Sequence, residues 1–168
     1  MKSIRNIAFS VLLTLGAFTA VTYTSCNKDE CKDVVCNNGG TCNDTDGSCT
    51  CATGYEGTNC ETKFSTKYIG TWTVTEACGS TNSKPYQITI TEVSANSILV
   101  KNLGNYACSG SDITWTATIT GANSFTIADK QCNTQMNATG TFSNNQISIT
   151  YTAAYSGKTD NCTATLKK

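Results

Sequence analysis

The chain has 168 residues, with 12 basic and 12 acidic side chains, 11 cysteines and no histidine. This length suits one ordinary domain or two small ones, and the zero formal net charge supplies no basic surface for a nucleic acid backbone. So many cysteines in a short chain favour an oxidising compartment, because cytosolic thiols are kept reduced.

The first segment has the features of an export signal. Lys2 and Arg5 precede an apolar run over residues 7–21. A short apolar run behind basic residues is typical of a cleavable signal, and this run is shorter than the roughly 20 residues that a membrane-spanning helix needs. The sequence therefore predicts a signal peptide over residues 1–25.

Residues 23–26, Tyr-Thr-Ser-Cys, resemble a loose bacterial lipobox. The resemblance implies that Cys26 becomes the acylated first residue of the mature protein. Removing Cys26 from eleven cysteines also leaves an even number for pairing. A terminus with several acyl chains anchors stably, whereas one chain binds only marginally. We expect a membrane-anchored lipoprotein with a lipidated, acidic tether over residues 26–30.

Lys28, Asp29 and Glu30 follow this expected anchor. A lysine followed by two acids at this position resembles the surface-export signal of lipoproteins in the Bacteroidetes. The resemblance implies attachment to the outer membrane with exposure at the cell surface. The alternative interpretation is a solvated charged spacer.

Six cysteines lie between Cys31 and Cys60, separated by 4, 5, 6, 1 and 8 residues. Zinc sites reuse short cysteine pairs, often with histidine, so this spacing favours disulfides and leaves 15 possible connectivities. The run over 38–42, Asn-Gly-Gly-Thr-Cys, and the ending over 51–60 resemble an EGF-like module spanning residues 31–60. The resemblance implies the pairs Cys31–Cys42, Cys36–Cys49 and Cys51–Cys60.

This module has too few apolar residues for a core. Val34, Val35 and Tyr55 are its only large apolar side chains, so the bridges must hold it together. Residues 27–31 also resemble the acidic entry of calcium-binding EGF modules, whose oxygen ligands suit a hard cation. That family has an aromatic residue where Asp-Gly-Ser stands at 46–48, so we expect no metal and no cofactor.

Beyond an expected linker at 61–67, apolar residues alternate with threonine and serine, the period of half-buried strands. Eight runs are predicted as strands of a second domain over 68–168: 68–77, 86–93, 97–103, 113–120, 124–129, 135–142, 146–155 and 162–167. Their apolar positions, including Trp72, Tyr86 and Phe142, are predicted to face inward. The fold class is thus mainly β.

The connections between these strands are of two kinds. Short polar turns lie at 94–96, 121–123 and 143–145. The longer connections each contain or border a cysteine, at Cys78, Cys108, Cys132 and Cys162. In an antiparallel meander alternate connections share one end, so these four cysteines are expected at one rim.

Closure of eight strands into a barrel makes the first and last strands antiparallel neighbours. This predicts the bridge Cys78–Cys162 and leaves Cys108–Cys132 as the second. The alternative fold is a β-sandwich of the immunoglobulin type, whose cysteines would occupy inward-facing strand positions and not loops.

The run over 68–72, Tyr-Ile-Gly-Thr-Trp, resembles the G-x-W signature of lipocalin-like barrels. The resemblance implies an eight-stranded lipocalin-like meander barrel. The arginine that normally packs over this tryptophan is absent, and Lys167 and Lys168 stand near the last strand instead. An eight-stranded barrel can be filled by its own side chains, so the resemblance says little about ligand binding.

Candidates for catalysis are few. The chain has no histidine, each cysteine has an expected bridging or lipid role, and no glycine-rich phosphate loop follows a strand. Glu92 and Asp129 keep the inward phase, but they belong to opposite rims, too far apart for the roughly 5 to 10 Å that paired acids need in glycoside hydrolysis. We read both as solvated strand ends and expect no enzyme.

These features predict a surface-displayed interaction protein, with the EGF-like module as a spacer and the barrel rim facing outward. Tyr106 and Tyr155 are candidate rim contacts, because exposed apolar patches tend to mark contact sites. The alternatives are a small-molecule binder that uses the barrel interior and a structural envelope protein. The expected partners are the membrane and a protein, glycan or small molecule of unknown identity, without nucleic acid, and the protein is expected to be a monomer.

Overall fold

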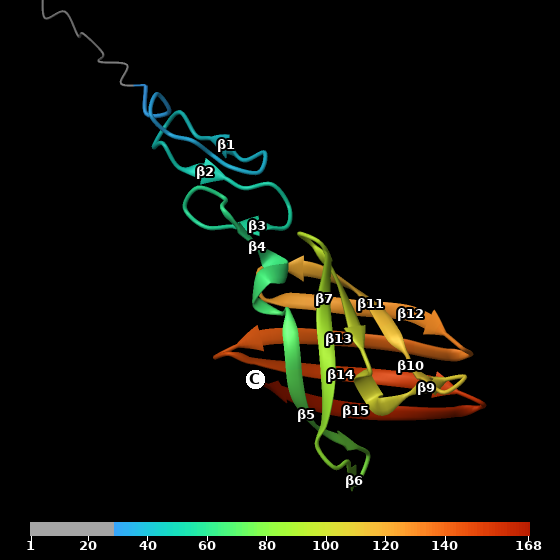
Figure 1. Cartoon of the computed structure of the whole chain (residues 1–168). Coiled ribbons are helices and arrows are strands. Elements are labelled where there is room, and N and C mark those ends of the chain that lie inside the picture. The colour runs from blue at the N-terminus through green and yellow to red at the C-terminus, as the bar shows by residue number, and fades with distance from the viewer. Residues whose placement is uncertain (1–28) are drawn as a thin grey trace, which may run out of the picture.

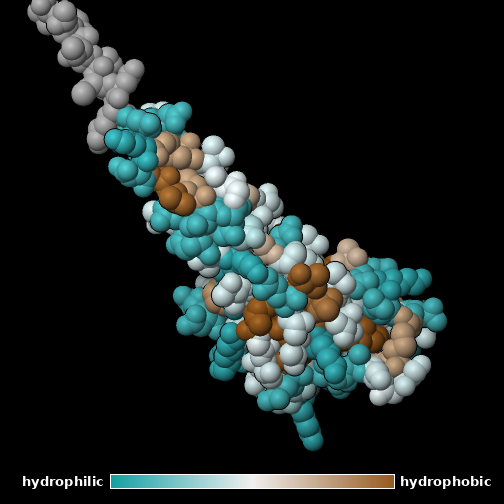
Figure 2. Space-filling view, turned by 45° about the horizontal axis from the view of Figure 1, so that its top comes forward, coloured by the Kyte–Doolittle hydropathy of each residue, from teal (hydrophilic) through white to brown (hydrophobic). Residues whose placement is uncertain are grey.

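The structure is a computed structural model that describes residues 29–168, so the expected signal peptide, Cys26 and Lys28 lie outside the described residues. The described chain is mainly β, with almost no helix. Figure 1 shows a small module in blue to green and a larger barrel in green to red, joined end to end. In Figure 2 the module forms a narrow extension of the barrel. Within the described range, no helix has the length and apolarity to cross a membrane.

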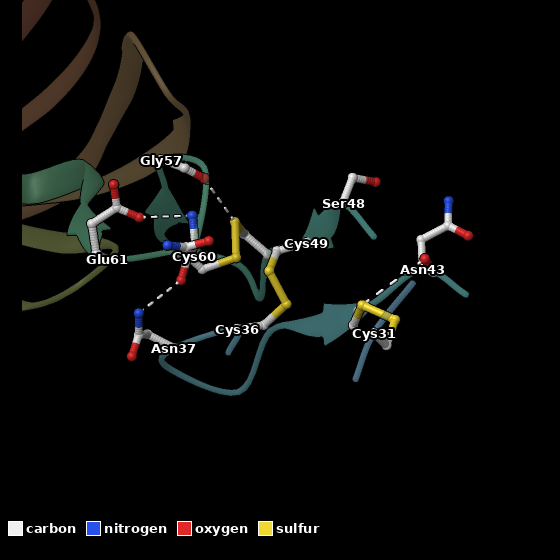
Figure 3. Close-up of a disulfide and its surroundings, with 12 residues drawn as sticks. Cys31, Cys36, Asn37, Asn43, Ser48, Cys49, Gly57, Cys60 and Glu61 are labelled. Carbon is white, nitrogen blue, oxygen red and sulfur yellow. Dashed lines mark hydrogen bonds between the residues drawn. A yellow bond between two sulfur atoms is a disulfide. The ribbon is translucent and has the colours of Figure 1, made fainter. Parts of the chain in front are cut away.

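The module contains four two-residue strands: β1 (Thr41–Cys42), β2 (Cys49–Thr50), β3 (Tyr55–Glu56) and β4 (Thr62–Lys63). Its disulfides are Cys31–Cys42, Cys36–Cys49 and Cys51–Cys60, the same pairs as expected. Figure 3 shows these bridges spaced one after another along the module, so that they link its loops and short strands along its length. A Cβ atom at Gly40 would lie 2.8 Å from the Cys60 sulfur, so the backbone packs directly on the bridge.

The segment expected as a linker has regular structure. It contains β4 and the 3-10 helix η1 (Phe64–Lys67), and the Phe64 amide donates to the carbonyl oxygen of Gly54 at 2.8 Å. Lys67 Nζ lies 2.7 Å from Glu56 Oε1 of the module and donates to the carbonyl of Ala122 in the barrel at 2.7 Å. One lysine thus contacts both parts of the protein.

The module also packs against a turn of the barrel. Gly54 has a positive φ of 94°, and a Cβ atom there would lie 3.0 Å from the Cβ of Ala95. Lys63 Nζ and Glu92 Oε1 lie 2.5 Å apart across the same junction. These contacts define the module-facing rim of the barrel.

Eight strands form the barrel: β5 (Gly70–Cys78), β7 (Tyr86–Ser94), β8 (Ser97–Lys101), β11 (Thr114–Gly121), β12 (Ser124–Gln131), β13 (Thr134–Ser143), β14 (Gln146–Tyr155) and β15 (Lys158–Lys167). Each pairs antiparallel with its neighbours, and β15 also pairs with β5, placing Cys162 opposite Cys78. The predicted eight-stranded closed barrel is therefore confirmed, and the sandwich alternative is wrong.

The two barrel disulfides, Cys78–Cys162 and Cys108–Cys132, are the pairs expected from closure. The predicted start of the last strand at Cys162 is wrong, because β15 begins at Lys158 and Cys162 lies inside it, 3% exposed. The reason is the turn: Ser156 and Gly157 have φ values of 47° and 74°, which suit a tight two-residue hairpin turn.

The barrel interior is filled by large side chains. The largest fully buried ones are Trp72, Trp115, Tyr68, Tyr151 and Phe125. The ring of Phe125 lies against Gly140 on the neighbouring strand, in the space that a side chain at 140 would occupy. Aromatic cover of a strand glycine is a known way to pack a curved sheet.

Two predicted inward residues, Tyr86 and Phe142, are only partly buried, because each lies near an end of the barrel. Glu92 stays in register with the buried Ile98 but is exposed at the module-facing rim, in agreement with its interpretation as a solvated strand end. The pairing of β7 with β8 shifts register just after it, between Glu92 and Ser94, which leaves Val93 58% exposed. An extra residue in one strand of a pair has this effect.

Candidate functional site

A polar hollow of about 500 Å³ lies at the end of the barrel that points away from the module. Figure 1 shows this distal rim near β6 (Thr81–Asn82), at the far end of β5 from the module. The loops that line it follow β5 and β8 and join β14 to β15. Its lining residues, which we call the rim pocket, are Glu76, Cys78, Ser83, Lys84, Pro85, Tyr86, Gly104, Asn105, Tyr106, Tyr155 and Asp160.

Glu76 is the most buried charged residue of the rim pocket, with 6% of its surface exposed. It keeps the inward phase of Trp72 and Val74 along β5, so the strand itself directs it into the barrel mouth. The hydroxyls of Tyr86 and Tyr151 both donate to its Oε2 at 2.7 Å. Two donors on one oxygen partly offset the cost of burying this carboxylate.

Asp160 has the same arrangement at the edge of the pocket. Tyr106 and Tyr155 donate to its Oδ2 at 2.8 and 2.9 Å. Their rings meet edge to face, with centroids 5.5 Å apart, a favoured geometry for aromatic pairs. The two carboxylates of the rim pocket are thus each held by two tyrosines.

Gly104 sets the position of one of these rings. It lies in the 3-10 helix η2 (Leu103–Asn105) with a φ of 78°, and a side chain there would collide with the ring of Tyr106. The Gly104 amide also donates to the hydroxyl of Tyr86 at 2.9 Å. The absence of a side chain at 104 therefore lets Tyr106 cover the loop backbone beside Glu76.

Burial raises the pKa of Tyr86, Tyr106 and Tyr151, and the hydrogen bonds to Glu76 or Asp160 raise it further. The hydrogen bond to Asp160 is the main cause of the raised pKa of Tyr155. These hydroxyls stay protonated at neutral pH and act as donors to the carboxylates. The hydroxyl oxygens of Tyr86, Tyr106 and Tyr155, which line the pocket, can then act as acceptors for a further group there.

The structure brings together Tyr106 and Tyr155, the predicted rim contacts, although both are half-buried and bound to Asp160. Glu92 and Asp129 lie elsewhere. Glu92 pairs with Lys63 at the module, and Asp129 Oδ2 accepts the Thr116 amide at 2.9 Å.

Asp29 and Glu30, two residues of the predicted export signal, lie at the start of the described chain. The Asp29 carboxylate accepts the Cys31 amide at 3.1 Å. The prediction that these residues act with Lys28 in export stays a prediction.

Sequence reasoning missed Glu76, although a signal was present. Its position four residues after Trp72 and two after Val74 predicts an inward carboxylate on a strand. Its partners Tyr86 and Tyr151 could not be assigned from the sequence, because they come from separate strands that closure of the barrel brings together.

A second hollow, of about 620 Å³, lies on the module beside Val35, which is 72% exposed. It is larger than the rim pocket, but its lining includes no charged side chain that is buried. Within residues 29–168, no group of three or more histidine, cysteine or acidic residues is placed to hold a metal ion.

No family model matches the chain, and no curated protein is similar to it. Among solved structures, a redesigned β-barrel is 18% identical and matches 62% of this chain and 93% of its own, with a TM-score of 0.46. A chain named EF1p2_mFAP2b, bound to DFHBI, is 15% identical over 61% of this chain and 94% of its own, with a TM-score of 0.47.

A protein from Bacteroides fragilis, provisionally described as an outer membrane protein, is 21% identical and matches 62% of this chain and 52% of its own, with a TM-score of 0.40. Because all three TM-scores are below 0.5, these similarities carry no functional inference.

Proposed function

We propose that the protein is a lipid-anchored, surface-displayed binding protein of the outer membrane, in which the module holds the barrel and the distal rim binds a ligand. The anchor is supported by the apolar segment before Cys26 and by the even number of cysteines that remain, all ten of which are paired. The resemblance of 31–60 to an EGF-like module supports the role of spacer.

The observation that carries the proposal is that the chain enters the barrel at one end and the rim pocket lies at the other. The chain enters the barrel through η1 at the module-facing rim, while the rim pocket opens at the other end. A tether at residue 26 therefore leads into the module, at the opposite end of the protein from the rim pocket. This geometry supports an arrangement in which the rim pocket faces away from the membrane.

The interior is the weaker candidate for ligand binding. Trp72, Trp115 and Tyr151 are at most 2% exposed and occupy the barrel axis together with the other core residues. Tyr151 donates to Glu76 and so closes the floor of the rim pocket. The ligand is therefore proposed to bind at the mouth. The proposal includes no catalytic step and needs no cofactor or second subunit.

Surface display is tested by inserting a specific protease recognition sequence after Gly79, an exposed position whose Cβ direction is open. Intact cells treated with that protease should yield two fragments on a reducing gel, since Cys78–Cys162 would hold the pieces together otherwise. Cleavage only after cell lysis would contradict display.

The lipid anchor is tested by labelling cells with a fatty-acid analogue. Incorporation of the label should be lost in Cys26→Ala, and equal labelling of the variant and the parent would contradict the anchor.

The export role of Lys28, Asp29 and Glu30 is tested by replacing all three with alanine. The variant should remain lipidated but become resistant to the protease on intact cells. Lys32→Ala with Asp33→Ala is the matched control, because these neighbours are also charged and exposed. Equal cleavage of both variants would favour the solvated spacer.

A further inference from the structure

The rim pocket contains negative charge without a paired cation. Among the described residues, three other acids have lysine partners: Glu56 with Lys67, Glu92 with Lys63, and Asp112 with Lys101. Neither Glu76 nor Asp160 forms an ion pair within residues 29–168. A buried carboxylate without a cation is costly unless hydrogen bonds or a ligand compensate for it.

One oxygen of Glu76 is left over after its tyrosine contacts. Both hydroxyls donate to Oε2, whereas Oε1 has a contact of 3.7 Å to the sulfur of Cys78. That sulfur belongs to the bridge with Cys162 and carries no proton to donate. Glu76 is only 6% exposed, but it lines the rim pocket. Its Oε1 can therefore accept a hydrogen bond from a ligand in that pocket.

The remaining walls are rich in acceptors and poor in donors. The tyrosine hydroxyls already donate their protons to Glu76 and Asp160, so towards a ligand they can act only as acceptors. The side-chain donors without another described partner are those of Lys84 and Asn105, which are both exposed. The pocket thus complements a group that carries several N–H donors and positive charge.

Aromatic rings strengthen the match. Tyr86, Tyr106 and Tyr155 all line the pocket, and a cation within about 6 Å of a tyrosine face is attracted by the ring quadrupole. The volume of about 500 Å³ lies in the range of small-molecule sites. Two carboxylates against one exposed lysine leave the lining with a net negative charge.

From these features we infer that the rim pocket binds an organic ammonium group, with Glu76 as the buried anion and Asp160 as the second anion at the edge. This inference rests on the proposed binding function and names its ligand class. The ammonium group belongs either to a free alkylamine or to a lysine side chain of another protein.

The test is isothermal titration calorimetry on the full chain in a neutral detergent, with 1,5-diaminopentane as the probe and 1,5-pentanediol as its uncharged match. The diamine should bind saturably, and the diol should bind at least about tenfold more weakly, because a hydrogen bond to a charged group contributes about 1.5 to 3 kcal/mol. No saturable binding of the diamine up to about 10 mM, or equal binding of the diol, would overturn the inference.

Variants locate the site. Glu76→Gln keeps the shape and the acceptor for the tyrosines but removes the charge, so diamine affinity should fall about tenfold or more. Asp160→Asn should lower it about fivefold, and Lys84→Gln should raise it about two- to fivefold by removing a competing cation. Glu92→Gln is the matched control at the other rim and should change nothing. Equal effects of Glu76→Gln and Glu92→Gln would overturn the assignment to the rim pocket.

Near-ultraviolet circular dichroism of each variant reports whether the tyrosines keep their packing. Lys84→Gln changes only an exposed residue, so it tests the site without altering a buried side chain. Titration of Nα-acetyl-lysine N-methylamide distinguishes the two sources. Affinity equal to that of the diamine indicates a lysine side chain, whereas tighter diamine binding indicates a free amine, and both support the ammonium site. If no amine binds, but the protease test on intact cells shows surface display, only this inference is overturned and the proposed surface display stands.

Discussion

The two ends of the barrel are built on different principles. At the module-facing rim, Tyr68 meets the rings of Phe125 and Phe142 edge to face, with centroids 5.5 and 5.9 Å apart. At the distal rim, tyrosines surround two carboxylates, and both barrel disulfides lie there. One end is closed by apolar packing, and the other stays polar and open.

This difference shows how a small barrel can have a pocket and remain closed. Apolar burial stabilises by about 25 cal/mol per Å², but an end lined by buried acids cannot use it fully. Covalent bridges do not depend on burial, because they act mainly by restricting the unfolded chain. The disulfides therefore stabilise the rim that the carboxylates weaken.

Removal of the distal bridges should have the largest effect on stability. Cys78→Ala with Cys162→Ala opens a loop with a sequence separation of 84, which chain-entropy estimates value at about 4 to 5 kcal/mol. Cys108→Ala with Cys132→Ala, with a separation of 24, should cost about 3 to 4 kcal/mol. Urea unfolding of both variants measures this order. A smaller loss for the 78–162 pair would show that hairpin pairing alone holds the seam between β5 and β15.

At the opposite end, Tyr68→Ala should lower the free energy of unfolding by about 3 to 4 kcal/mol, because it removes a fully buried ring. Tyr68→Phe is the matched control. The Tyr68 hydroxyl has no hydrogen-bond partner within residues 29–168, so its removal should leave stability unchanged or raise it by about 1 kcal/mol. Urea unfolding midpoints of the two variants test these expectations. A clear loss of stability in Tyr68→Phe would mean that the Tyr68 hydroxyl has a hydrogen-bond partner.

The sequence predicted the frame of the barrel well, because alternation of apolar residues and threonine is a direct consequence of strand geometry. The bridge Cys78–Cys162 followed from closure, since only a closed barrel makes the first and last strands antiparallel neighbours and places these two cysteines side by side. The turn at Ser156 and Gly157 was harder to predict. A left-handed backbone conformation at a serine is uncommon. Because the turn is so tight, β15 begins at Lys158, four residues before the predicted start.

The site was predictable only in part. Tyr106 and Tyr155 were predicted as rim contacts, but their shared partner Asp160 follows a turn that was predicted to be part of a longer connection. Glu76 was overlooked although it continues the phase of Trp72. Alternation predicts which way a strand residue points, but not which residues from distant strands meet it in the barrel mouth.

Alkaline pH should destabilise both ends through their buried tyrosines. Burial raises the pKa of Tyr68 to about 12 from its ordinary value of 10.0. Between these values the unfolded chain loses this proton while the folded chain keeps it, so stability is full below pH 10 and falls as pH rises, by about 1.4 kcal/mol per pH unit for one tyrosine. Urea unfolding as a function of pH measures the slope. Tyr68→Phe should lessen it, and an unchanged slope would place the effect in the distal tyrosines alone.

The smallest effect concerns the last residue of the chain. Lys168 Nζ lies over the ring of Trp72, 4.7 Å from its centroid. Trp72 is 1% exposed, so the cation covers a ring that is otherwise buried at the module-facing side. Lys168→Ala should lower the free energy of unfolding by about 0.5 to 1 kcal/mol, the usual strength of a cation–π contact at an accessible site. Lys167→Ala is the control, because it removes the same charge from the neighbouring exposed position. Thermal unfolding monitored by tryptophan fluorescence compares the two, and equal losses would assign the effect to net charge near the end of β15 and not to contact with Trp72.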